Sequence, residues 1–425
     1  MKTIGLSLDQ APRLSIPASF FLSVPIGVLL AGAILLKSGN AALVSPWMPQ
    51  ALALTHAGTL GVLAMGMIGA LYQMTPVVAG APVPLTRIAH IVHVLLLVGL
   101  AGFVLRLLGG STLAMTVAIV CFSVALPAFL LPLGWALLRA PAKDETVQGM
   151  RVAVASLAVI TVIGLVLASG FAGGTFSANR MLWILVHLTV ALLGWVGGLI
   201  MAVSWHVIPM FYLTSTVGKT TKRRLLVLLL TGLVLPLLVA ITGVGFDGYL
   251  STSRLAAIAA LPAAIAIWLL HPALTLRNIR HRQRKRSDAS LFFWQAGLIS
   301  GLLMIPIAVA ALVLPDPRWQ VLFGWLLIWG WAATIMHGML TRIVPFLVWF
   351  HRYSARVGLE IVPSMRSLLS QQRIKTGFIL HLSSVLLGVI AIYFQTDWLA
   401  QLTGLLLVAT AFSIASMLIH VLRSR

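Results

Sequence analysis

Apolar residues fill this chain in long windows, and most polar and charged residues gather between the windows. A helix needs about 20 mostly apolar residues to cross a bilayer. Twelve windows meet this requirement, and they cover residues 15–37, 52–75, 87–108, 111–138, 150–170, 181–211, 224–246, 252–274, 289–313, 319–349, 375–393 and 397–421. The pattern predicts an all-α, polytopic membrane protein with 12 transmembrane helices.

The second, sixth and tenth windows end in the same signature. Counted back from a proline, each has a glycine 15 residues earlier and a large polar residue three residues earlier. The prolines are Pro76, Pro209 and Pro345, the glycines are Gly61, Gly194 and Gly330, and the polar residues are Gln73, His206 and Arg342. This spacing predicts an internal threefold repeat.

The repeat predicts one integral membrane domain over residues 1–425, built from units near 15–138, 150–274 and 289–421. We expect three pseudo-equivalent arcs of four helices, with the three marked helices innermost. A glycine within a helix permits close approach of another helix or of a flat ligand. The proline near the end of each marked helix is expected to stop or kink it.

Composition agrees with a membrane environment. The chain is 60% hydrophobic and 9% charged, and its mean hydropathy is +1.05. A soluble globule of this size would need more polar surface. The eight acidic residues all fall in predicted loops or at helix ends, so we expect neither a carboxylate-coupled secondary transporter nor a hydrolase with paired carboxylates. The single cysteine, Cys121, excludes an intrachain disulfide.

Charge predicts the orientation. If the N-terminus is cytoplasmic, most of the 29 Lys and Arg residues fall in cytoplasmic loops, and the opposite loops hold only Lys37, Arg106, Arg180, Arg254 and Arg318. The positive-inside rule therefore predicts that both termini are cytoplasmic. The net charge of +21 mostly records this topology. The basic run 280–286 lies between two windows, so its expected partner is the lipid bilayer and not nucleic acid.

Histidine supplies the ionisable groups inside the membrane. His56 lies 20 residues before Pro76 and His187 lies 22 residues before Pro209, so the two are expected within roughly 3 Å of one depth. An imidazole there is either a heme or metal ligand or an interfacial hydrogen-bonding residue at a helix start. His337 lies in mid-helix, but the sequence identifies no partner ligands for it, and His271 and His381 fall on helices without the signature.

Together these features resemble subunit I of the heme-copper oxidases and nitric oxide reductases. The resemblance rests on the twelve helices in three arcs, on histidines near the outer ends of the second and sixth helices, and on the ending Gly69 to Pro76. The chain is similar in the same way to heme- and copper-containing membrane proteins of bacterial nitric oxide responses. The resemblance implies that His56 is a heme ligand and His187 a copper ligand.

Two parts of the family pattern are missing. The adjacent histidines of the seventh helix are absent from 224–246, and the His-x-His pair of the tenth helix is absent from 319–331. An iron–copper reaction centre would then lack ligands, so oxygen or nitric oxide reduction is not expected. The expected protein is a degenerate relative that binds heme b or copper through His56 and His187. Its role would be sensing, cofactor handling or electron transfer with a quinol or cytochrome partner.

A different class of function remains open at the other end of the marked helices. Gln73, His206 and Arg342 would be polar groups at the cytoplasmic ends of three central helices. They suit a passive carrier or channel for a small neutral or anionic solute, because an intramembrane arginine favours an anion. Arg342 could equally extend to the lipid headgroups.

Overall fold

The protein is an all-α polytopic membrane protein. The computed structural model describes residues 12–175, 179–243, 251–283, 285 and 288–424. Within these residues, twelve helical spans are long and apolar enough to cross a membrane, and each overlaps one predicted window. We number them span 1 to span 12 in chain order. In an apolar environment a helix satisfies its own backbone hydrogen bonds, which is why each long apolar window becomes one span.

Five spans are single α-helices. Span 1 continues into a short 3₁₀ turn, and span 3 begins with one, η4 (Thr86–Ile88). The helices are α1 (Ser15–Ser38) followed by η2 (Gly39–Ala42), α4 (Ala89–Leu107), α5 (Thr112–Arg139), α9 (Lys219–Thr242), α13 (Ser290–Val313), α16 (Gln371–Phe394) and α17 (Asp397–Arg423) in spans 1, 3, 4, 7, 9, 11 and 12. Span 5 is α6 (Glu145–Ser169) with a final 3₁₀ turn, η5 (Gly170–Ala172). Two starts are capped by side chains: the Asp144 carboxylate accepts from the Val147 N–H at 3.0 Å, and the Ser370 hydroxyl accepts from the Arg373 N–H at 3.3 Å.

The three marked spans share a π-helical segment in their first half. Span 2 is α2 (Pro49–His56), η3 (Ala57–Ala64) and α3 (Met65–Ala79); span 6 is α7 (Arg180–Thr189), η6 (Val190–Gly197) and α8 (Gly198–Tyr212); span 10 is α14 (Arg318–Trp325), η8 (Leu326–Ala332) and α15 (Ala333–Arg352). In each span the signature glycine lies inside the π-helical segment. Span 8 contains a further π-helical segment, η7 (Ile265–Leu270). It follows α10 (Thr252–Ala259) and α11 (Leu261–Ala264) and precedes α12 (His271–Arg280).

Each signature glycine faces the span that precedes its own. A Cβ at Gly27 of α1 would lie 2.9 Å from the Cα of Gly61. A Cβ at Gly194 would lie 2.8 Å from the Cβ of Ser156 on α6, and one at Gly330 would lie 2.7 Å from the Oγ of Ser300 on α13. The prediction that these glycines face another helix or a cofactor is therefore confirmed, and the neighbour is a helix in all three spans.

The signature prolines do not end their helices. Helix α3 continues for three residues after Pro76, α8 for three residues after Pro209, and α15 for seven residues after Pro345. Each proline lacks an N–H and so leaves the carbonyl four residues earlier without its usual helical donor. Of the stop or kink that was expected, the stop is therefore not found, and the kink stays a prediction.

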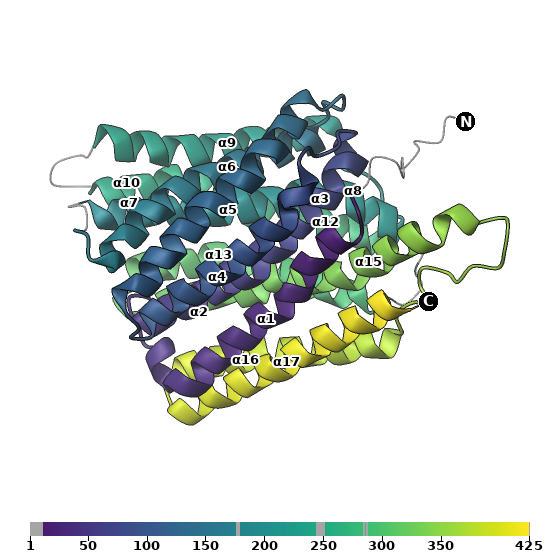
Figure 1. Cartoon of the computed structure of the whole chain (residues 1–425). Helices are drawn as coiled ribbons and strands as arrows, with labels where there is room; N and C mark the ends of the chain where they lie inside the picture. Colours follow the sequence, from purple (N-terminus) through teal and green to yellow (C-terminus); the bar gives the residue numbers. More distant parts are fainter. Residues whose placement is uncertain (1–11, 176–178, 244–250, 284, 286–287, 425) are drawn as a thin grey trace. The chain divides into compact units, whose positions relative to one another are not determined.

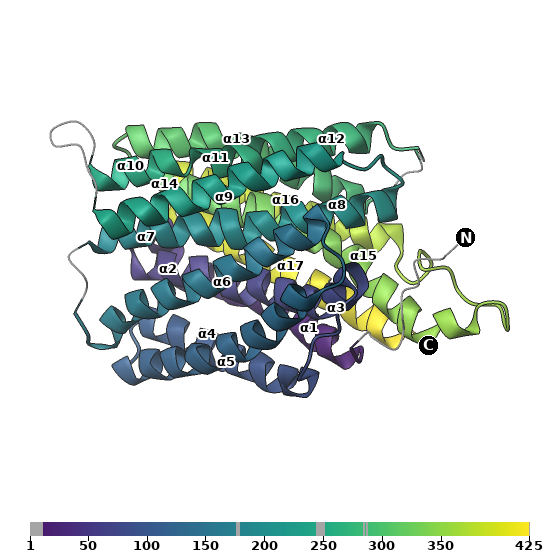
Figure 2. The ribbon, with the colours of Figure 1, turned by 90° about the horizontal axis from the view of Figure 1, so that it is seen from above.

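The chain divides into two compact units. The first contains Met1–Val77 and Arg286–Arg425, and the second contains Val78–Lys285. In the first unit, α1 packs along α17, α17 packs along α16, and α13 packs along η8 and α15 (Figure 1). In the second unit, α4 packs along α5, α5 packs on α6, and α6 lies against η6 and α8 (Figure 2). The single domain with three repeats stays a prediction.

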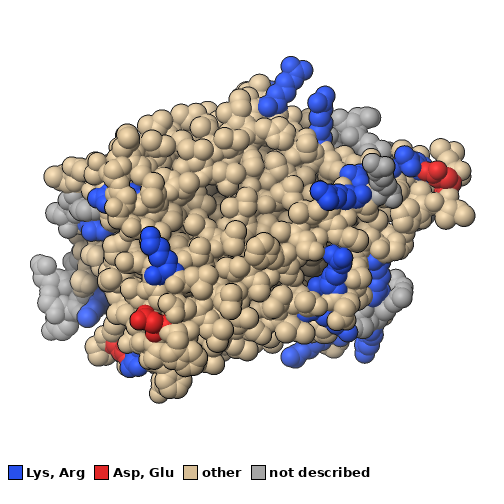
Figure 3. All heavy atoms as spheres, turned by 60° about the horizontal axis from the view of Figure 1, so that its bottom comes forward, with Lys and Arg blue, Asp and Glu red and all other residues tan. Residues whose placement is uncertain are grey.

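Charged side chains are sparse on the surface. Figure 3 shows Lys and Arg in small groups, separated by broad stretches of uncharged surface. Many large apolar side chains are exposed in the described residues, including Leu131, Leu138 and Ile241. Such a surface suits contact with lipid.

Candidate functional site: buried histidines and arginine

His56 is the last residue of α2 and directly precedes the π-helical segment η3. Its Nδ1 lies 2.8 Å from the carbonyl oxygen of Leu52. A carbonyl oxygen only accepts, so Nδ1 carries the proton and Nε2 carries the lone pair. Histidines that ligate a metal commonly donate their other ring N–H to such a carbonyl. His56 therefore has the tautomer that an axial ligand requires.

The backbone beyond His56 is closely approached by span 10. A Cβ at Gly58 would lie 2.6 Å from the Cγ2 of Ile328 and 3.3 Å from the Cζ2 of Trp329. Glycine at this position permits contact between η3 and η8, and both segments belong to the first unit. Spans 2 and 10 therefore meet next to His56.

His187 lies on α7, three residues before η6, and is half-buried. Gly164 of α6 faces it, since a Cβ at Gly164 would lie 3.1 Å from the Cε1 of the imidazole. The missing side chain gives the ring its space. His187 belongs to the second unit and His56 to the first, so shared ligation by these two residues stays a prediction.

The three polar residues near the signature prolines have different surroundings. Gln73 is 2% exposed, and neither its amide nitrogen nor its amide oxygen has a hydrogen-bond partner among the described residues. His206 is exposed on α8. Arg342 is buried on α15. Common spacing along the chain therefore does not give these residues a common environment.

Arg342 is not the lone intramembrane arginine that the sequence suggested. Its guanidinium forms an ion pair with the Asp288 carboxylate, and its Nε donates to the Ser290 hydroxyl at 2.8 Å. That hydroxyl donates in turn to Asp288 Oδ1 at 2.7 Å. Helix α13 packs along α15 and begins beside the end that carries Arg342. This packing brings an acid from outside the apolar window to the arginine.

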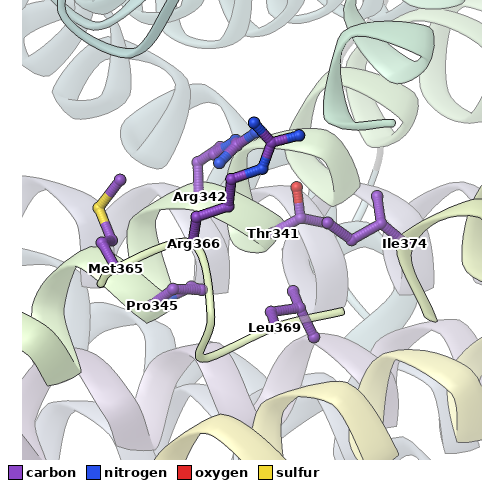
Figure 4. A pocket seen from close by; sticks show the side chains of 7 residues that line it. All are labelled: Thr341, Arg342, Pro345, Met365, Arg366, Leu369 and Ile374. Atoms are coloured by element: carbon purple, nitrogen blue, oxygen red, sulfur yellow. The ribbon is translucent and has the colours of Figure 1, made fainter. Parts of the chain in front are cut away.

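A small pocket lies on the same part of span 10. It is lined by Thr341, Arg342, Pro345, Met365, Arg366, Leu369 and Ile374. Figure 4 shows the Arg342 and Arg366 side chains extending in the same direction from the helix and from the following loop. Two guanidinium groups on one pocket favour an anionic group. Asp288 is paired with Arg342, and Arg366 is the second guanidinium group of the pocket.

The largest surprise is a buried histidine pair on spans 10 and 11. His337 of α15 and His381 of α16 are each 3% exposed, and their ring centroids are 5.4 Å apart at an interplanar angle of 81°. Phe293 of α13 lies against both rings, 4.4 Å from His337 and 6.3 Å from His381 between centroids. The sequence identified neither residue as a partner of the other.

A third buried histidine lies in the second unit. His271 at the start of α12 is 1% exposed, and its Nε2 lies 2.9 Å from the Ser204 hydroxyl of α8. The Ser204 hydroxyl also donates to the Met201 carbonyl at 2.7 Å, so it accepts the hydrogen bond from His271 Nε2. No second histidine ring is stacked on His271 among the described residues.

One feature of the sequence bears on the contact between His337 and His381. His337 lies 15 residues before the last residue of α15, and His381 lies 10 residues after the first residue of α16. Helices joined in a hairpin run antiparallel, so residues at similar distances from the turn lie at similar depths. This register makes a contact possible, but it does not tell which faces of the two helices meet.

The described residues contain no group of three or more His, Cys, Asp or Glu side chains arranged to hold a metal ion. Heme iron needs only one or two axial histidines, so each histidine must be weighed on its own surroundings. Comparison with known proteins adds no assignment. No protein-family model matches the chain, and no curated protein sequence is significantly similar to it.

Proposed function

We propose that the protein is a membrane-embedded heme b-binding protein in which His56 is an axial ligand. The observation that carries the proposal is the hydrogen bond from His56 Nδ1 to the Leu52 carbonyl at 2.8 Å. It fixes the ring orientation and leaves the lone pair on Nε2, as in metal-ligating histidines.

His187 is the candidate ligand of the second unit. The absence of a side chain at Gly164 gives its imidazole space, and its position in front of a π-helical segment repeats that of His56. π-Helical segments are frequent at functional sites. His187 would hold a heme or a copper ion of the second unit, and copper is the role that the family resemblance implies for it.

A bound heme would supply one-electron chemistry. The chain contributes the orientation of the ligand and a membrane environment that excludes water. Spans 7 and the first half of span 10 contain no histidine, so the proposed role is sensing, cofactor handling or electron transfer and not reduction of oxygen or nitric oxide. The protein would be a degenerate relative of oxidase subunit I, with a quinol or cytochrome as redox partner.

We place the protein in the inner membrane of a bacterium with both termini in the cytoplasm. The support is the distribution of Lys and Arg between alternate loops. In this orientation His56 lies toward the outer face and the Arg342 pocket toward the cytoplasm. An external redox partner would then meet the protein on the side of His56.

The test is the heme content of the full chain, purified in detergent and measured as the pyridine hemochrome. We expect His56→Ala to remove heme while the protein still inserts, because insertion depends on the apolar spans. His187→Ala tests the second ligand in the same way. His90 is exposed, so His90→Ala is the matched control and should keep its heme. Unchanged heme in both the His56 and the His187 variants would refute the proposal.

A carrier for a small solute is a second candidate because of Gln73. Its buried amide has no partner for either polar atom among the described residues, and a polar solute would satisfy both. The Arg342 and Arg366 pocket adds an anion-binding group. Light scattering of proteoliposomes, with glycerol as the neutral probe and chloride as the anionic probe, tests this candidate. Permeation that Gln73→Leu abolishes would favour it, and impermeable vesicles would reject it.

A further inference from the structure

The buried pair His337 and His381 has a hydrogen-bonding pattern that points to a ligand. His381 Nε2 lies 3.1 Å from the Trp329 carbonyl oxygen and 2.8 Å from the Thr334 hydroxyl. The carbonyl only accepts, so His381 Nε2 must carry the proton. The Thr334 hydroxyl donates to the same carbonyl at 2.8 Å and can accept from the ring. The basic nitrogen of a neutral His381 is therefore Nδ1.

His337 has no such arrangement. It makes no hydrogen bond with any described residue, although it is 3% exposed, and its Nδ1 is fully enclosed. A neutral imidazole has one N–H and one lone pair, so the enclosed Nδ1 is unsatisfied either as a donor or as an acceptor, whichever tautomer is present. A buried polar group without a partner costs free energy, and such a group calls for an explanation such as a bound ion.

We propose that His337 and His381 together bind one copper(I) ion within the first unit. Two imidazoles that share an ion at about 2.0 Å from each nitrogen have ring centroids at most about 6.3 Å apart, and this limit is reached in a linear arrangement. The observed separation is 5.4 Å. His381 also has the hydrogen bond from its other ring nitrogen to a backbone carbonyl that metal-ligating histidines commonly have. The site is separate from His56 and does not depend on heme.

Charge selects copper(I) among the metals that imidazole binds. The energy needed to bury an ion in a low-dielectric medium grows with the square of its charge, so a monovalent ion is easier to bury than zinc, iron(II) or copper(II). No acidic side chain joins the two histidines as a third ligand among the described residues. A monovalent ion with two neutral nitrogen ligands is therefore the best match to the site.

The surroundings keep the site small. Phe293 covers the face of His337 at 4.4 Å between ring centroids. Gly377 of α16 also approaches that ring, since a Cβ there would lie 3.2 Å from His337 Nε2.

The test is anaerobic copper(I) binding by the purified full chain, in competition with the chromogenic chelator bicinchoninic acid. We expect wild-type protein to hold about one copper ion per chain, with a shell of nitrogen ligands in X-ray absorption. His337→Ala and His381→Ala should each lower the copper affinity by more than about 100-fold. Thr334→Val should lower it by about tenfold, since it removes a contact that orients His381.

Two matched variants separate this site from the rest of the molecule. His271→Ala removes an equally buried histidine that lacks a histidine partner, and it should leave copper binding unchanged. His56→Ala should also leave it unchanged even where it removes heme, so that failure of one proposal does not imply failure of the other. If His381→Ala does not fold, His381→Gln and His337→Gln replace the alanine variants. Equal copper binding by wild type and the His337 and His381 variants, or equal loss in His271→Ala, would overturn the proposal.

Discussion

Spans 6 and 10 carry the same backbone signature but bury different chemistry. In both, a π-helical segment places a glycine against a serine of the preceding span, Ser156 or Ser300. In span 10 the residue three before the proline is Arg342, which is buried and paired with Asp288. In span 6 the equivalent residue, His206, is exposed. The signature therefore specifies how these helices pack, but it does not determine the identity or the burial of their polar groups.

The buried histidines extend this difference. Span 6 supplies Ser204 to a single histidine, His271. Span 10 supplies both Thr334 and a histidine of its own, His337, to His381. The first unit thus contains two adjacent imidazoles on spans 10 and 11. Helices that share a backbone signature can carry different polar groups in this way.

The strongest test of the comparison is removal of the buried charge pair. Arg342→Ala should lower the free energy of unfolding by about 3 to 5 kcal/mol, because Asp288 keeps a buried charge without its partner. The exposed counterpart variant, His206→Ala, should stay within about 0.5 kcal/mol of wild type. Denaturation by SDS in mixed detergent micelles measures both. Equal effects of the two variants would show that the environments do not differ as described.

Glycine substitution tests the feature that the two spans share. Gly194→Ala and Gly330→Ala should each lower the free energy of unfolding by about 1 to 3 kcal/mol, because the new Cβ meets a serine of the neighbouring helix. Combining them with Ser156→Gly and Ser300→Gly, respectively, should give a favourable coupling energy in a double-mutant cycle. Gly324 has nothing within 4 Å of an added Cβ, so Gly324→Ala is the control. Purely additive effects in either span would break the parallel between them.

The hydroxyl contacts give the smallest expected effects. Ser204→Ala removes the only hydrogen-bond partner of His271 Nε2 in the described residues, at an expected cost of about 1 to 2 kcal/mol. Thr334→Val should cost less, about 0.5 to 1 kcal/mol, because His381 keeps the Trp329 carbonyl. The same SDS denaturation gives the order of the two. The reverse order would contradict the tautomer assigned to His381.

The sequence was sufficient to predict the twelve spans, because a bilayer imposes a length and a composition on every helix that crosses it. It was also sufficient for the glycines, since a recurring glycine at a fixed distance from a proline indicates a recurring close contact. It left open whether each proline stops or kinks its helix, and all three helices continue past their prolines. Helix interiors within a membrane protein tolerate proline better than the rule for soluble helices suggests.

The polar pairs were beyond reach of the sequence for a physical reason. Contact between His337 and His381 depends on how each helix is rotated about its axis, and apolar windows with little amphipathic pattern do not record that rotation. Asp288 lies just outside the predicted window 289–313. Its ion pair with Arg342 follows only from the packing of α13 along α15. The depth of a residue can be counted along its helix, whereas the direction in which its side chain points requires the structure.

The reduced-minus-oxidised absorption spectrum of the purified wild-type protein, combined with its iron content, tests the central claim most directly. Cells supplied with ample heme should yield protein with a Soret band, a b-type spectrum and stoichiometric iron, because His56 offers an oriented imidazole in an apolar setting. A colourless, iron-free protein that is folded and correctly inserted would contradict the account.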